Sequence, residues 1–117
     1  MIAAVIFQSP PHGTAGGREG LDAALALSAF ARRVDVYFLG DGVYQLKGGQ
    51  DPAGILSRDH ARTFGVLPLY DVGPVHVLAR DLAARGLRAE DLILPCRLLE
   101  PEELRALLGQ AGPKLVF

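Results

Sequence analysis

The chain has 117 residues, half of them hydrophobic, and a formal net charge of −1 at pH 7. This length gives one domain with a substantial core, over residues 1–117, and excludes two domains. Near-neutral charge gives no electrostatic reason to expect strong, direct binding to nucleic acid. Cys96 is the only cysteine, which excludes an intrachain disulfide and a zinc site built on several thiolates. No apolar run approaches the roughly 18 residues of a membrane span, and the amino terminus lacks the pattern of a signal peptide, so we expect a cytoplasmic protein.

The first segment predicts a strand, a loop and a helix. Ile2–Phe7 is a short apolar run with β-branched residues that ends at turn-forming residues, which is typical of a buried strand. A helix rich in alanine and leucine is expected from Gly20 to Arg32, with two arginines at its last turn. The loop between them contains four candidate site residues, Pro11, His12, Gly13 and Thr14.

This first loop has two interpretations. It ends at a helix amino terminus, where free N–H groups and the helix dipole favour an anion. However, its glycines stand at positions 13, 16, 17 and 20 with no lysine after them, which fits neither a P-loop nor a dinucleotide-binding fingerprint. The alternative is that the glycines only shape a tight turn.

The segment 34–39 predicts a second strand, parallel to the first after a right-handed crossover. Ligands and partners usually dock at the carboxyl edge of such a sheet. We therefore expect the residues after this strand to lie beside the first loop and to complete a site for a partner or an anion. These residues are Asp41, Gly42, Tyr44 and Gln45.

The rest of the chain continues the alternation of helices and strands. Helices are expected at 52–65, at 79–86 and at 101–108, and strands at 67–70 (short), 75–79, 92–94 and 114–117. The overall order predicts an α/β fold with a mostly parallel five-stranded sheet and helices on both faces. His60 has no second histidine or carboxylate at metal spacing, so a solvated surface histidine is favoured over a metal ligand. Neither a metal site nor a cofactor is expected.

Four motifs in combination, PHGT, GREGLDA, DGVYQL and the LYD turn, resemble the DsrE/DsrF family over nearly the whole chain, and within it the TusC/DsrF type of subunit. The resemblance implies a flavodoxin-like fold. It also implies a place in a heterohexamer, TusBCD or, in sulfur oxidisers, DsrEFH, that passes persulfide sulfur between proteins. The implied partners are TusB/DsrH-like and TusD/DsrE-like subunits, with sulfur-carrier proteins reached through the complex. TusBCD supplies sulfur for 2-thiouridine in tRNA.

Persulfide relay requires an accessible, activated thiolate. In the catalytic relatives this cysteine ends the third strand, just before a helix. Aligning on the sequence ARDLAARG places Leu78 or a neighbour there, and leucine cannot carry sulfur. The resemblance therefore implies a non-catalytic subunit whose partner performs the thiol chemistry.

Two residues keep alternative roles at this point. Cys96 precedes Arg97, a cation able to lower a thiol pKa, and is interpreted either as a sulfur carrier or as a small buried hydrophobic residue at the end of a strand. His12 is either a base or neighbour of the sulfur site, or a structural contact in its loop or between subunits.

The functional classes left open are a partner-binding subunit of a sulfurtransferase complex, an autonomous sulfurtransferase that uses Cys96, and an anion-binding or nucleotide-binding module. The cluster of aromatic residues in VYFLGDGVYQL predicts an oligomer.

Overall fold

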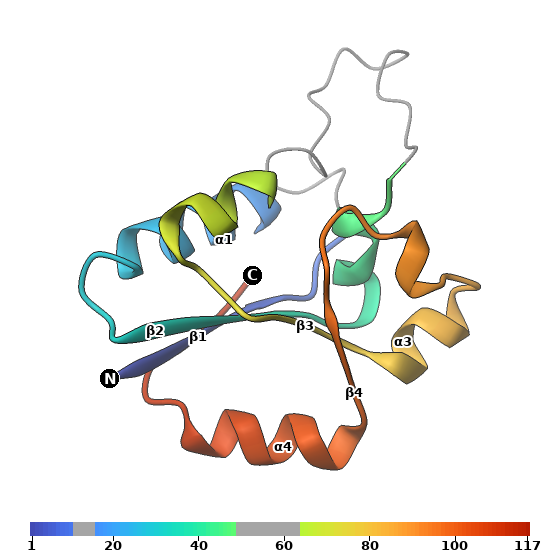
Figure 1. Ribbon diagram of the computed structural model, residues 1–117. Helices are drawn as coiled ribbons and strands as arrows, with labels where there is room; N and C mark the ends of the chain where they lie inside the picture. The colour runs from blue at the N-terminus through green and yellow to red at the C-terminus, as the bar shows by residue number, and fades with distance from the viewer. Residues whose placement is uncertain (11–15, 49–63) are drawn as a thin grey trace.

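The computed structural model describes residues 1–10, 16–48 and 64–117, which form a central sheet between two layers (Figure 1). All four strand pairs are parallel, in the order β4-β3-β2-β1-β5. The strands are β1 (Ile2–Phe7), β2 (Arg33–Phe38), β3 (Val75–Leu78), β4 (Arg97–Leu99) and β5 (Lys114–Val116). The predicted five-stranded parallel sheet is confirmed.

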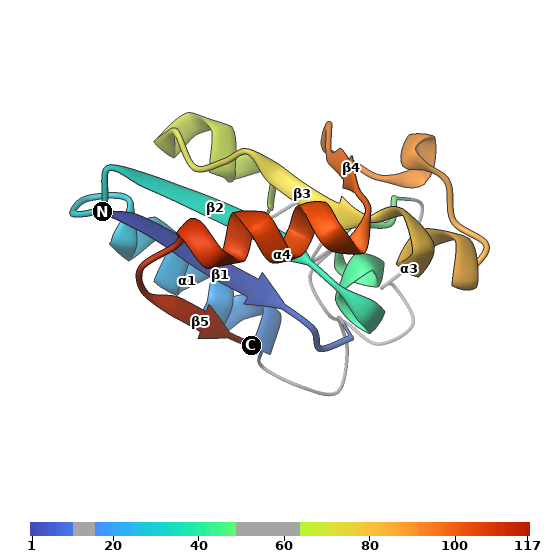
Figure 2. The ribbon, with the colours of Figure 1, turned by 90° about the horizontal axis from the view of Figure 1, so that it is seen from below.

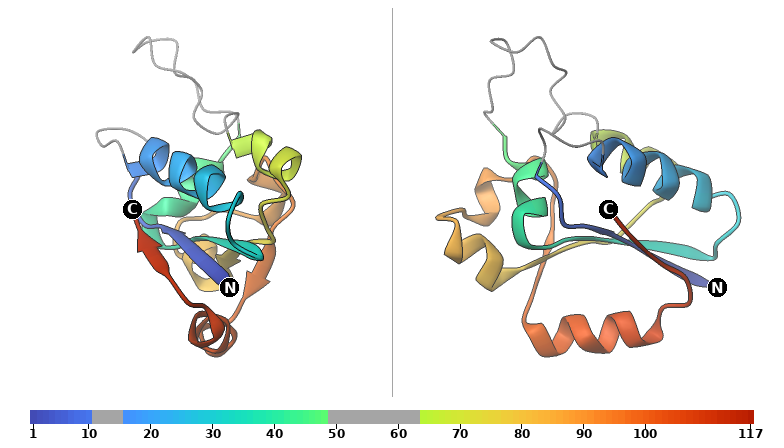
Figure 3. Two further views of the ribbon diagram at one scale, coloured as in Figure 1. Left: turned by 90° about the vertical axis from the view of Figure 1, so that its left-hand side faces the viewer. Right: turned by 180° about the vertical axis from the view of Figure 1, so that it is seen from behind.

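Helices cover both faces of this sheet, as the sequence predicted. Seen along the sheet, α1 (Gly16–Leu27) and the 3-10 helix η3 (Phe64–Tyr70) lie on one side, and α4 (Pro101–Gln110) lies alone on the other (Figures 1 and 3). Three short elements follow strand ends or link strands, η1 (Gly40–Leu46), α3 (Ala79–Ala84) and η4 (Ala89–Asp91). No helix in the described ranges is long and apolar enough to cross a membrane.

The core on the α1 face is built around stacked aromatic rings. Phe7 of β1 pairs in register with Phe38 of β2, so the two side chains point to the same face, with ring centroids 4.6 Å apart and nearly parallel planes. Phe64 at the start of η3 meets both rings edge-on, at 5.3 and 5.1 Å. These three fully buried rings fix η3 over the centre of the sheet.

The opposite face, which we call the α4 face, has a smaller apolar cluster. Buried side chains of β1 to β4 pack there against partly exposed leucines of α4, and no α4 residue is itself fully buried. The view from below shows α4 running along β1 and β2 (Figure 2). The buried members of this cluster are Ala4, Ile6, Tyr37, Leu78 and Leu99.

The first helix begins and ends earlier than predicted. It spans Gly16–Leu27, not Gly20 to Arg32. The helix ends just before Ser28, whose hydroxyl donates a hydrogen bond to the Leu25 carbonyl oxygen at 2.6 Å, and residues 28–30 form turns. Phe30, which the predicted range includes, lies after α1 and is 82% exposed, so it does not pack on the sheet. Arg33 does not cap a helix but begins β2.

Two predicted strands are also wrong. Residues 67–70 belong to η3, and Pro68 within it has no N–H to donate to a sheet. Residues 92–94 follow η4 and make only an isolated antiparallel bridge, Lys47 to Leu92. The fourth strand is Arg97–Leu99, so Cys96 precedes a strand rather than ending one.

The helix predicted at 52–65 falls almost wholly on residues 49–63, which lie outside the described residues, as does His60. Phe64, which the predicted range includes, is the first residue of η3 and is buried.

Candidate functional site

The candidate site lies at the carboxyl edge of the sheet, where β1, β2 and β3 end. The four loop residues Pro11, His12, Gly13 and Thr14 lie outside the described residues. The other four predicted residues, Asp41, Gly42, Tyr44 and Gln45, all fall in η1, directly after β2. The described part of the site is therefore η1 with its neighbours.

Gln45 joins η1 to both flanks of the first loop. Its side chain is fully buried, and Nε2 donates to the carbonyl oxygen of Ser9 at 2.9 Å. Its Oε1 lies against Gly17 near the start of α1, so closely that a Cβ on Gly17 would collide with it. The Nε2 of Gln45 thus connects η1 to the end of the β1 segment, while its Oε1, which has no hydrogen-bonding partner among the described residues, packs against the beginning of α1.

Gly42 allows η1 to lie against the end of β1. A Cβ at this position would overlap the Phe7 carbonyl group. That carbonyl oxygen cannot retreat easily, because it accepts a hydrogen bond from the Leu39 N–H at 2.9 Å. Gly42 and Gly17 therefore serve close packing at this edge.

An ion-pair network connects η1 to α3. Arg85 approaches Asp41 with Nε and Nη2, at 3.1 and 3.0 Å from the same carboxylate oxygen. Asp81 accepts a hydrogen bond from the Gly40 N–H at 2.8 Å, and its carboxylate lies 3.9 Å from Arg85. Gly40 has a φ of +54°, a value that glycine adopts without strain. These contacts hold the turn after β2 against the helix after β3.

Tyr44 is half-buried in the single chain, on the same short helix. It therefore retains exposed surface that a partner would cover. Its expected burial by a partner remains a prediction.

The end of β3 has the geometry that the family resemblance implies for a relay cysteine. Leu78 is the last residue of β3 and directly precedes α3. It is only 4% exposed and packs in the apolar cluster of the α4 face. This position accordingly has neither a thiol nor an exposed side chain.

Cys96 lies toward the other end of the sheet. It directly precedes β4, whose Leu99 pairs with Leu78, so about 10 Å of strand separates Cys96 from the level of Leu78. Burial raises the pKa of the Cys96 thiol to about 11. The thiol donates to the Leu94 carbonyl oxygen at 3.3 Å. Such a thiol is protonated at neutral pH and is a poor nucleophile.

The described residues contain no group of three or more His, Cys, Asp or Glu side chains able to hold a metal ion.

The α4 face contains buried polar residues that the sequence interpretation missed. Asp35, Tyr37 and His76 are at most 2% exposed. A signal was present, because Arg33, Asp35 and Tyr37 alternate with apolar residues along β2.

Comparison with known proteins gives the family. The sequence profile of the DsrE/DsrF-like family matches residues 1–117. This chain belongs to the DsrE/DsrF-like family. It is 48% identical over 112 residues to "Protein TusC homolog" of Vibrio parahaemolyticus serotype O3:K6, with 96% of this chain and 95% of that protein covered. It is 41% identical over 112 residues to "Protein TusC homolog" of Vibrio vulnificus, with the same coverage.

Two solved structures share the fold of this DsrE/DsrF-like chain. The ychN protein of E. coli superposes with a TM-score of 0.81 at 21% identity, over 99% of this chain and 97% of that one. The protein of unknown function MTH1491 from Methanobacterium thermoautotrophicum superposes with a TM-score of 0.64 at 14% identity, with the same coverage. At these identities the superpositions show the fold alone.

Proposed function

We propose that this chain is a non-catalytic, TusC-like subunit of a cytoplasmic persulfide relay complex that supports formation of 2-thiouridine in tRNA. The observation that carries the proposal is the buried Leu78 at the end of β3, where the catalytic relatives have their cysteine. The near full-length similarity to TusC homologues supports the same assignment.

The partners in this proposal are a TusB/DsrH-like and a TusD/DsrE-like subunit. The TusD/DsrE-like subunit supplies the thiolate, and this chain contributes surface and rigidity. The hydrogen bond from Gly40 to Asp81, the Asp41–Arg85 ion pair and the buried Gln45 order the carboxyl edge before a partner binds, which lowers the entropic cost of docking. Tyr44 and its neighbours provide an amphipathic contact at that edge.

The proposal is tested by reconstitution. This chain is mixed with the two partner subunits, and assembly is measured by light scattering after gel filtration. Sulfur transfer to an acceptor protein is then followed with a labelled persulfide donor. We expect a hetero-oligomer in which Cys96→Ser leaves transfer at the wild-type rate. Replacing the relay cysteine of the TusD/DsrE-like subunit by serine, the matched control, should abolish transfer.

The alternative in which the chain is an autonomous sulfurtransferase predicts the reverse. A persulfide trapped on Cys96, with transfer lost in Cys96→Ser alone, would establish that alternative. A chain that stays monomeric at micromolar concentration with both partners present would contradict assembly.

A second alternative concerns the pathway, because a DsrEFH-type complex acts in sulfur oxidation. Deleting the gene for this chain and measuring 2-thiouridine in total tRNA distinguishes a role in tRNA thiolation from a role in sulfur oxidation. Loss of the modified base supports tRNA thiolation, and unchanged 2-thiouridine excludes it.

A further inference from the structure

A strip of polar side chains crosses the α4 face of the sheet, away from the carboxyl edge. Side chains that pair in register on neighbouring parallel strands point to the same face. Tyr37 of β2 pairs with His76 of β3, and His76 pairs with Arg97 of β4. Arg33 and Asp35 lie on the same face of β2, four and two residues before Tyr37, respectively. We call these five residues the polar strip.

Two buried polar atoms of this strip lack hydrogen-bonding partners. The rings of Tyr37 and His76 stack with centroids 4.7 Å apart, and both residues are fully buried. Neither the Tyr37 hydroxyl nor His76 Nε2 has a partner among the described residues. A buried polar group left in this state is costly, so each of these atoms requires an explanation.

The tautomer of His76 follows from its one hydrogen bond. Nδ1 lies 3.2 Å from the Val36 carbonyl oxygen, which can only accept, so Nδ1 carries the proton. Nε2 of the neutral ring therefore has a free lone pair. Burial lowers the pKa of His76, which keeps the ring neutral at pH 7 in the unbound protein. If Nε2 gains a proton, it becomes a second charged donor on this face.

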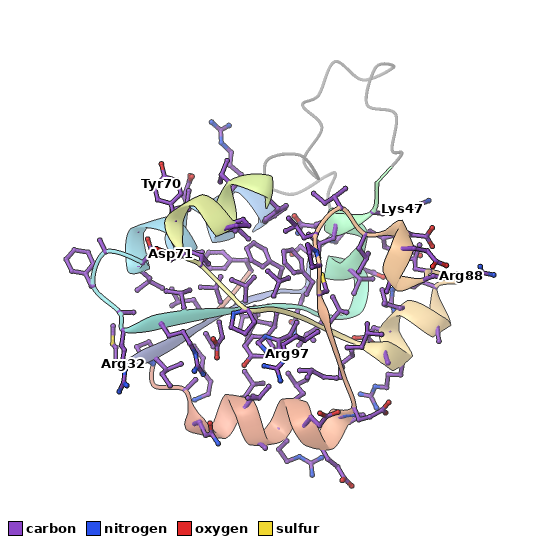
Figure 4. The ribbon with its side chains drawn as sticks, viewed as in Figure 1. Arg32, Lys47, Tyr70, Asp71, Arg88 and Arg97 are labelled. Atoms are coloured by element: carbon purple, nitrogen blue, oxygen red, sulfur yellow. The ribbon has the colours of Figure 1, made fainter. Side chains whose placement is uncertain are left out.

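Among the described residues, the charged side chains around the ring differ in whether they are paired. Arg33 donates hydrogen bonds from Nε and Nη2 to the two carboxylate oxygens of Asp35, at 2.7 and 3.0 Å, so the negative charge of Asp35 is balanced by this arginine. Arg97 has neither a hydrogen bond nor an ion pair with any described residue, although it is close enough to affect the pKa values of Tyr37 and His76. Figure 4 shows its side chain on the α4 side of the sheet. Leu104, Leu107 and Leu108 of α4 pack on the apolar cluster of this face.

We propose that the polar strip is a binding site for a small oxyanion, held by the Arg97 guanidinium and the Tyr37 hydroxyl, with His76 taking up a proton as the anion binds. A bridging water would satisfy Tyr37 and His76 but would make no use of the positive charge of the exposed Arg97 guanidinium. An oxyanion has enough acceptors for all three donors. Because the Arg97 side chain is exposed and unpaired within the described part of the chain, it can move aside to admit the ion.

The proposed site is distinct from the carboxyl edge and does not depend on the relay function. It is tested on the isolated chain with sodium sulfate, which keeps the same charge between pH 6 and 8. Binding is followed by calorimetry, and the ring nitrogen shifts of His76 are followed by NMR. Sodium chloride at matched ionic strength is the control for screening. We expect saturable binding that is about tenfold tighter at pH 6 than at pH 8, with His76 protonated in the complex.

Three variants identify the donors. Arg97→Gln should weaken sulfate binding by roughly ten- to a hundredfold, the range for a lost charge-assisted hydrogen bond. Arg105→Gln, which removes an exposed cation from α4, should leave binding unchanged. Tyr37→Phe keeps the stacked ring and removes only the hydroxyl, so the protein should stay folded and bind sulfate about tenfold more weakly.

The proposal fails if binding does not saturate, or if Arg97→Gln and Arg105→Gln bind sulfate equally. It also fails if Tyr37→Phe gains stability with unchanged affinity, because the hydroxyl would then be an unused buried group. A His76 ring that stays neutral at saturating sulfate would overturn the proton uptake.

Discussion

Replacing Gly42 by alanine tests whether the glycine of the predicted site is there for packing. The new Cβ would overlap the Phe7 carbonyl group, which a hydrogen bond from Leu39 holds in place. Overpacking costs about 1–3 kcal/mol, and we expect the upper part of that range because backbone rather than a flexible side chain opposes the methyl group. With an unfolding entropy of about 2.1 cal/mol/K per residue, a loss of about 2–3 kcal/mol lowers the melting temperature of 117 residues by roughly 8–12 °C.

Gly109→Ala is the matched control. Gly109 lies in α4 with nothing within 4 Å of an added Cβ, so alanine should stabilise the helix by about 0.5–1 kcal/mol. Both variants are unfolded by heat and by urea at one protein concentration, with far-ultraviolet circular dichroism as the signal. If Gly42→Ala melts at or above the wild-type temperature while Gly109→Ala behaves as expected, the close approach of η1 to β1 is refuted.

Three further predictions concern side chains already described. Because burial raises the pKa of Cys96 to about 11, its alkylation rate should keep rising from pH 7 to 10, and a plateau near pH 8 would contradict this environment. Arg85→Gln should lower the free energy of unfolding by less than about 1 kcal/mol, and by less still in high salt, because the side chain of its partner Asp41 is 58% exposed. A loss above about 2 kcal/mol in urea unfolding would contradict a solvent-screened pair. The native pKa of His76 is lowered below 6.5, so the unfolded state binds more protons at acidic pH, and the free energy of unfolding without sulfate should fall as the pH drops from 7 to 5. A rise over that range would mean that His76 is charged in the folded protein.

The sequence by itself determined the elements whose signals are local. The run Ile2–Phe7 was predicted as a buried strand and is β1. Pro101 at the first helical position, with acidic residues in the first turn, marked the start of α4. There the Glu103 carboxylate accepts a hydrogen bond from the Glu100 N–H at 3.0 Å. Such signals act within a few residues and need no knowledge of the fold.

Tertiary structure decided which residues meet, and with what consequence. Only the fold brings Arg85 to Asp41, 44 residues away, and places Gly42 against the carbonyl of Phe7. The alternation along β2 could have revealed a polar face, but no local pattern aligns Tyr37 with His76, because the register of parallel strands is set by packing across long connections. The error at residues 92–94 has the same origin. An apolar triplet fits a strand or a buried turn equally well, and the neighbours of β3 decide which one forms.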